Sequence, residues 1–150
     1  MSEVSLTPVG KEQIHRLESA LLIGSILRPD VLEELRNPAE RLTWVDSLAV
    51  AAAALAREKA KMTITQIAEE LGRTEATIRN HIQGKTKAGQ IVKETYEKFL
   101  REGVKIELPE AVAERSREDI KKITNTLKEI SQTIDQAKEK LQNLIESLQK

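Results

Sequence analysis

Residues 74–83 carry polar and small side chains at a spacing that would set them along the outward side of a short helix. Arginine can make two hydrogen bonds to guanine, and asparagine or glutamine can make two to adenine, so a helix in a major groove could read bases with them. Each good pair of this kind gives about 1–3 kcal/mol of discrimination. The candidates for this chemistry are Thr74, Glu75, Ala76, Arg79, Asn80 and Gln83.

Hydroxyl and cationic side chains flank this set on both sides. Such groups, together with the free amides at a helix N-terminus, bind phosphate oxygens and fix the register of a protein on a duplex without reading its sequence. The candidates for phosphate contacts are Thr63, Thr65, Arg73, Thr77, Lys85 and Lys87. Glu75 would either accept a hydrogen bond from cytosine or repel phosphate at wrong registers.

The pattern around these residues predicts two short helices joined by a tight turn, over about residues 63–84. Thr63 and Gln66 have the spacing of a capping box, which begins a helix. Gly72 stands where a tight turn needs a positive φ, and Thr74 is placed to cap the second helix. The residues expected to fill the junction between the two helices are Ile67, Ala68, Leu71 and Ile78.

Residues 67–82, IAEELGRTEATIRNHI, resemble the LuxR/GerE-type helix-turn-helix of bacterial response regulators, and TIRNHI is similar to the recognition helix of that group. Arg73 departs from the common pattern, in which an apolar residue follows the glycine, and Gly84 ends the second helix early. Over residues 28–101 the chain also resembles a small archaeal family of probable regulatory proteins found beside KaiC-like ATPases. That resemblance is carried by LTWVDSLAVAAAALAR and by MTITQIAEELGRTEATIRNHIQGKTKAGQIVKETY. It implies a regulatory role, with a KaiC-like ATPase as a further candidate partner.

Residues 110–150 contain no glycine or proline and carry a heptad repeat for more than four heptads. Apolar residues at alternating steps of three and four form a seam that one helix cannot bury, so we expect an oligomer interface in a coiled coil. The seam consists of Ile120, Ile123, Leu127, Ile130, Ile134, Ala137, Leu141, Leu144 and Leu148. The flanking positions offer no clear ion pairs, and Ile145 broadens the apolar face. The helices could therefore pair in parallel or antiparallel, and the assembly could be a homodimer or a tetramer. Packing of this helix on its own domain is the alternative.

The predicted fold class is all-α: a helix-turn-helix domain with a long C-terminal coiled-coil helix. Apolar residues make up 39 % of the chain and only three residues are aromatic, which suits helices packed on helices through Leu, Ile, Val and Ala. We divide the chain into an N-terminal helical segment (1–42), a helix-turn-helix DNA-binding domain (43–103), and a linker with the oligomerisation helix (104–150). The net charge is zero, but residues 57–101 contain ten basic and six acidic residues.

Nothing in the sequence predicts catalysis, a cofactor or a bound metal, so we expect a non-enzyme. Cysteine is absent, and the two histidines have no metal-binding spacing. The Gly-Lys-Thr at 84–86 is not a phosphate-binding loop, because Arg79 stands where that motif needs a glycine. There is no signal-peptide pattern, and the longest apolar run, 48–56, is far shorter than the ~20 residues of a membrane span. We therefore expect a cytoplasmic protein without a membrane partner; abundant Glu and Lys fit a thermophile.

These observations favour a transcriptional regulator that places the second helix in the major groove of double-stranded DNA and assembles through its C-terminal helix. Two other functions fit the same sequence: a protein-interaction adaptor for a KaiC-like signalling ATPase, and an architectural DNA-binding protein with little sequence preference. The basic excess in residues 57–101 favours DNA over the adaptor. It is small for a strong non-specific binder, whose affinity depends on many phosphate contacts.

Overall fold

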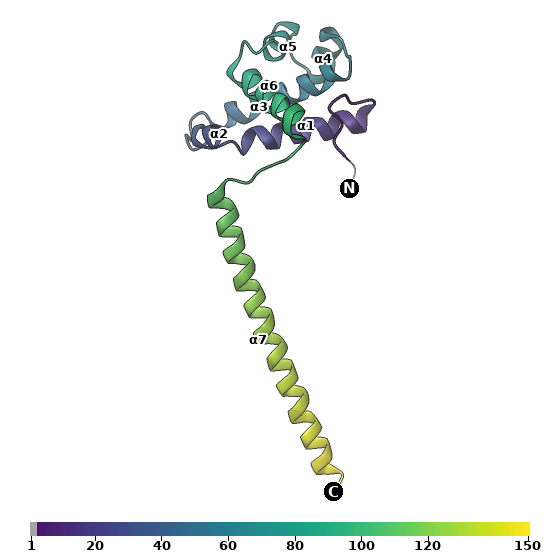
Figure 1. The fold of residues 1–150 in the computed structure, drawn as a ribbon, viewed down its shortest axis with the longest axis vertical. Coiled ribbons are helices and arrows are strands. Elements are labelled where there is room, and N and C mark those ends of the chain that lie inside the picture. Colours follow the sequence, from purple (N-terminus) through teal and green to yellow (C-terminus); the bar gives the residue numbers. More distant parts are fainter. Residues whose placement is uncertain (1–2) are drawn as a thin grey trace. The chain divides into compact units, whose positions relative to one another are not determined.

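The structure is a computed structural model that describes residues 3–150. All regular structure in this range is α-helical, and a long C-terminal helix follows several shorter ones, which confirms the predicted fold class (Figure 1). The helices are α1 (Lys11–Ile26), α2 (Pro29–Glu34), α3 (Arg41–Lys59), α4 (Ile64–Leu71), α5 (Glu75–Ile82), α6 (Lys87–Glu102) and α7 (Glu110–Leu148). Within the described range, no helix is both long and apolar enough to cross a membrane.

The chain forms two compact units, which divide between Glu107 and Leu108. The first unit contains α1–α6 and the second contains α7. The predicted boundary after residue 42 does not separate two units, because α1 packs against both α3 and α6. The apolar side of α1 needs that surface for burial, so the N-terminal segment shares the core of the following residues.

Helix α3 is the centre of the first unit. Its buried alanines present little side-chain volume, which lets neighbouring helices approach closely. Leu17 of α1, Leu48 of α3 and Phe99 of α6 are almost completely buried and meet in the same core. Gly24 of α1 allows a close approach to α6, since an added Cβ would lie 3.0 Å from Cζ of Phe99.

A smaller core joins α4 and α5 to α3. It consists of Ala54 from α3, Ile67 and Ala68 from α4, and Ile78 from α5, all of which are buried. Leu71 is partly buried and packs against the same cluster. The four residues expected at the junction between the two short helices thus lie in this cluster or against it, which confirms the predicted packing of the helix pair, and Ala54 of α3 adds to it.

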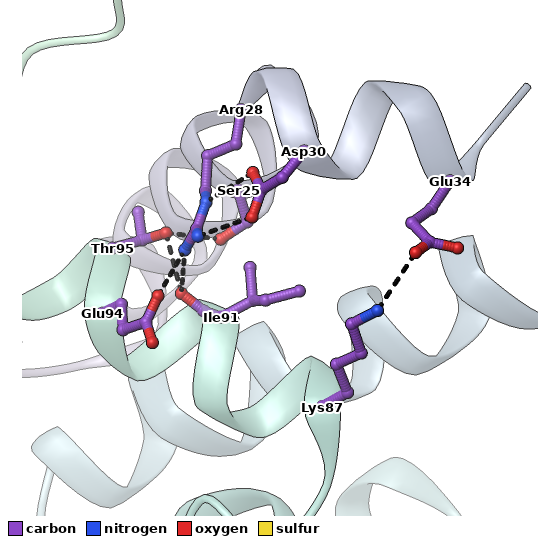
Figure 2. A network of polar contacts seen from close by, with 8 residues as sticks. All are labelled: Ser25, Arg28, Asp30, Glu34, Lys87, Ile91, Glu94 and Thr95. Atoms are coloured by element: carbon purple, nitrogen blue, oxygen red, sulfur yellow. Dashed lines mark hydrogen bonds and ion pairs between the residues drawn. The ribbon is translucent and has the colours of Figure 1, made fainter.

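Polar groups tie α1 and α2 to α6, as Figure 2 shows. The guanidinium of Arg28 donates hydrogen bonds to both carboxylate oxygens of Asp30, at 3.1 and 2.8 Å, and to Glu94 at 2.8 Å. The hydrogen bond from Arg28 lowers the pKa of Asp30. Beside it, the hydroxyls of Ser25 and Thr95 lie 2.8 Å apart in the core. These contacts hold the first two helices in a fixed position on the surface of α6.

Helix α7 contains 39 residues and is about 58 Å long. None of its residues is buried, and the apolar seam is exposed along the helix, with Ile120 62 % and Leu148 78 % exposed. Three threonines that flank the seam donate their hydroxyls to backbone carbonyls four residues earlier, at 2.8–3.0 Å. Those hydroxyls are therefore satisfied by the helix itself and would not resist burial beside an apolar partner.

Candidate nucleic-acid interface

The helix pair α4–α5 is built by local hydrogen bonds that the sequence predicts. The backbone amide of Gln66 donates to the Thr63 hydroxyl at 3.3 Å, and the Thr63 amide donates to the Gln66 side chain at 3.0 Å, which completes the capping box. Gly72 ends α4 with φ 64° and ψ 36°, a left-handed conformation that glycine adopts without steric cost. Thr74 then caps α5 by accepting a hydrogen bond from the Thr77 amide at 3.2 Å.

Helix α5 has one buried side and one exposed side. Ile78 and His81 are buried against the rest of the unit. The six residues assigned to base reading are all exposed, and the structure brings them together at the start and along the outer side of α5: Thr74, Glu75, Ala76, Arg79, Asn80 and Gln83. Within residues 3–150, the side chains of Asn80 and Gln83 make no hydrogen bond to another group. Their donors and acceptors are therefore free for a ligand.

Glu75 organises the exposed side of α5. One carboxylate oxygen accepts a hydrogen bond from the Thr65 hydroxyl of α4 at 2.8 Å, and the other lies 3.8 Å from the Arg79 guanidinium one turn along α5. An exposed ion pair at this spacing contributes only a few tenths of a kcal/mol, so Arg79 can leave Glu75 at little cost. The pair offsets the charge of Arg79 when no other anion is near.

The residues assigned to phosphate contacts divide into two groups. Lys85 is exposed beside the helix pair, and its ammonium has no ion-pair partner in the described range. Thr63 and Thr65 are also exposed, but the Thr63 hydroxyl accepts from the Gln66 amide and the Thr65 hydroxyl donates to Glu75. The hydroxyl of Thr77 is half-buried and lies 2.9 Å from that of Thr74, so it already has a local partner. Arg73 is held by Asp46 of α3 at 3.2 Å.

Lys87 is directed toward α2 and α3. Its ammonium lies 3.1 Å from a carboxylate oxygen of Glu34 and 5.0 Å from the centre of the Trp44 ring (Figure 2 draws the ion pair). This ion pair and cation–π contact would both be given up if Lys87 moved to a phosphate. The ion pair is largely exposed and therefore weak, so Lys87, like Arg73, has a local partner that a phosphate would have to replace.

The C-terminal end of α5 rests on the start of α6. Gly89 is essential to this contact, because an added Cβ would lie 2.2 Å from the His81 carbonyl oxygen. The Thr86 hydroxyl accepts a hydrogen bond from the Gly89 amide at 3.0 Å and lies 2.7 Å from Nδ1 of His81. Its own proton can therefore be donated to Nδ1 of a neutral imidazole. Burial lowers the pKa of His81, while the Asp46 carboxylate offsets part of this effect.

Arg57 fixes α4 to the first unit and has no counterpart among the sequence-based assignments. Its side chain is only 6 % exposed, and it donates to Glu18 of α1 at 2.8 Å, to Glu70 of α4 at 3.0 Å and to the Ala53 carbonyl at 3.0 Å. One guanidinium thus links three helices. Sequence alone shows only an arginine near the end of an alanine-rich helix, and neither acid lies within helical spacing of it.

Comparison with known proteins gives one match of high similarity. The relative, "Uncharacterized protein MJ1053" of Methanocaldococcus jannaschii, is 50 % identical over 127 residues. The aligned region covers 83 % of this chain and 78 % of the relative. No family model matches the sequence, and no solved structure matches it.

Proposed function

This chain belongs to the same family as the archaeal protein MJ1053, and we propose that it is a sequence-specific DNA-binding regulator of transcription that works as an oligomer. The observation that carries the proposal is the exposed side of α5, where arginine, asparagine and glutamine side chains project from a short helix that is anchored on its other side. These are the side-chain types that recognise guanine and adenine in the major groove.

The dimensions of α5 support this role. The major groove is about 12 Å wide and admits an α-helix, whose diameter with side chains is about 10–12 Å, and the eight residues of α5 give a segment about 12 Å long. The left-handed Gly72 and the shared core of Ile67, Ala68 and Ile78 fix α4 against α5. The start of α4 has amides suited to a phosphate. A helix pair held this way would present base-reading groups and a backbone contact from one rigid surface.

The exposed seam of α7 supports assembly with a second copy. Nine apolar positions over about 43 Å are left without a partner in the described chain, and the same helix of another copy is complementary to them by symmetry. Two copies would supply two recognition helices, as required to read half-sites about 34 Å apart. Replacing Ile130 by Asp in the full chain should reduce the mass measured by light scattering to that of the monomer.

Arg79→Ala and Lys85→Ala test the proposed roles separately. We expect Arg79→Ala to weaken binding to a selected site far more than binding to random DNA, because it removes about 1–3 kcal/mol of base discrimination. Lys85→Ala should weaken binding to both DNAs about equally and flatten the salt dependence. Arg101→Ala at the far end of α6 is the matched control for loss of an exposed cation. Equal losses on both DNAs for Arg79→Ala would contradict the base-reading role.

A further inference from the structure

The residue types at the two core positions of the α7 heptad, a and d, are not those of a two-stranded coil. Isoleucine at a with leucine at d favours two parallel strands, whereas isoleucine at both positions, or leucine at a with isoleucine at d, favours three or four. In α7 the d positions hold Ile123 and Ile130, beside Ile120 and Leu127 at a. These four side chains are 50–62 % exposed on the helix, so all of them are available for packing between copies.

The positions that flank the seam, e and g, carry no charge over residues 120–137. In a two-stranded coil these positions border solvent and are often glutamate or lysine. Here they hold Thr124, Thr126, Ser131 and Thr133, while every charged residue of this stretch lies at b or c. The three threonine hydroxyls donate to carbonyls of their own helix, so their burial leaves no hydroxyl proton without an acceptor.

The face that α7 offers to a partner is therefore wider than a two-stranded seam. A two-stranded seam uses a and d alone, whereas a helix in a bundle also buries e or g. Near the C-terminal end, Ile145 at e is 51 % exposed and continues the wide face. Lys138 and Lys140 occupy e and g between these parts, and their apolar stems can cover the edge of a bundle while the ammonium groups stay in water.

We propose that α7 associates with the α7 helices of three other copies in a four-helix coiled coil. The core residues favour three or four strands, and the uncharged flanks allow each helix to contact more than one neighbour. The choice of four rests on the proposed function, because reading a DNA site with two-fold symmetry requires copies in pairs. A tetramer supplies two such pairs of recognition helices.

Sedimentation equilibrium of the full chain measures the number of copies. The expected mass is about 67 kDa, four times the 16.8 kDa of one chain. Thr126→Glu combined with Thr133→Glu places charge at two g positions and should lower the mass to about 34 kDa or less, twice that of one chain. Asn125→Glu combined with Gln132→Glu adds the same charge at the adjacent f positions, opposite the seam. This matched control should keep the mass of the original chain.

A second variant changes the number of strands without adding charge. Ile123→Leu, Leu127→Ile and Ile130→Leu together place isoleucine at a and leucine at d over residues 120–134, with almost unchanged side-chain volume. This variant should form a dimer of about 34 kDa, twice the 16.8 kDa of one chain, with the helical circular dichroism of the original chain. If it remains a tetramer, the core residues do not set the number of strands and the inference is wrong.

The outcomes separate this inference from the rest of the proposed function. An original chain that is a dimer or a trimer would overturn the four-helix coil and leave assembly in place, and a monomer would overturn both. A tetramer formed by Thr126→Glu with Thr133→Glu would also overturn it, because the flanks would then not be buried. A tetrameric original chain that binds no duplex would support the four-helix coil and contradict DNA binding.

Discussion

Replacing Gly89 by alanine perturbs the contact that supports the base of α5. The added Cβ would lie 2.2 Å from the His81 carbonyl oxygen and 2.8 Å from its carbonyl carbon and Cα. A Cβ essentially never lies closer than 3.0 Å to such atoms, so α6 and α5 must separate by about 1 Å. The obstructing atoms are backbone, and no side-chain rotation can relieve the overlap.

The expected loss of stability follows from two opposing terms. Alanine is favoured over glycine in a helix by about 1 kcal/mol, which would stabilise α6. Inserting a methyl group into a closely packed contact costs about 1–3 kcal/mol and occasionally more, and the backbone overlap places this site at the upper end. We therefore expect Gly89→Ala to lower the free energy of unfolding of the first unit by about 2 kcal/mol.

Urea unfolding followed by Trp44 emission measures this loss. The chain has a single tryptophan, which lies in α3 and packs against the core of the first unit, so its signal does not depend on α7. Gln90→Ala, at the adjacent exposed position, is the matched control and should change the free energy by less than about 0.5 kcal/mol. A Gly89→Ala protein as stable as the original, or more stable, would refute the close approach of α5 and α6.

Three further changes test other parts of the structure. Arg57→Met keeps the apolar stem but removes the cation that pairs with Glu18 and Glu70. Because both carboxylates are partly exposed to solvent, the free energy of unfolding should fall by only about 2 kcal/mol in the same assay. The pKa of His81 is lowered in the folded chain from its ordinary value of 6.5, so below about pH 6.5 the unfolded chain binds more protons than the folded chain. The free energy of unfolding should therefore be highest above that pH and fall as the pH drops. His81→Gln should flatten this part of a pH series. Glu75→Gln frees Arg79 and removes a charge that repels phosphate, so anisotropy should show up to about fivefold tighter binding to random DNA. An unchanged affinity would show that Glu75 does not limit non-specific binding.

The parts of the fold that depend on neighbours in sequence are predictable from the residues. The helix caps and the turn form between residues at most four positions apart. The capping box of Thr63 and Gln66, the left-handed turn at Gly72 and the cap at Thr74 all form as the sequence predicts. The heptad seam of α7 is likewise a property of one helix, and its residues are exposed along that helix. Whether the seam pairs with another copy remains a prediction, because pairing depends on a second chain.

The parts that depend on distant residues could not be predicted in the same way. In the sequence Gly89 is an ordinary helix residue, and its role depends on the contact between α5 and α6. Arg57 has the sequence pattern of a surface cation, and its role depends on carboxylates that α1 and α4 bring to it. The position of Lys87 in the sequence likewise does not show that α2 brings Glu34 to its ammonium. The packing of α1 on α3 and α6 is hidden for the same reason, because a break between helices in sequence does not show which helices share a core.

Selection of random DNA duplexes on the full-length protein, at about 0.15 M salt, tests the central claim most directly. Retained duplexes are sequenced, and the Arg79→Ala protein is carried through in parallel. The proposed function predicts an enriched motif with two-fold symmetry and half-sites about one helical turn apart, and a loss of enrichment for Arg79→Ala. Retention without any motif would point to an architectural role, and no retention at all would contradict DNA binding and favour the adaptor function.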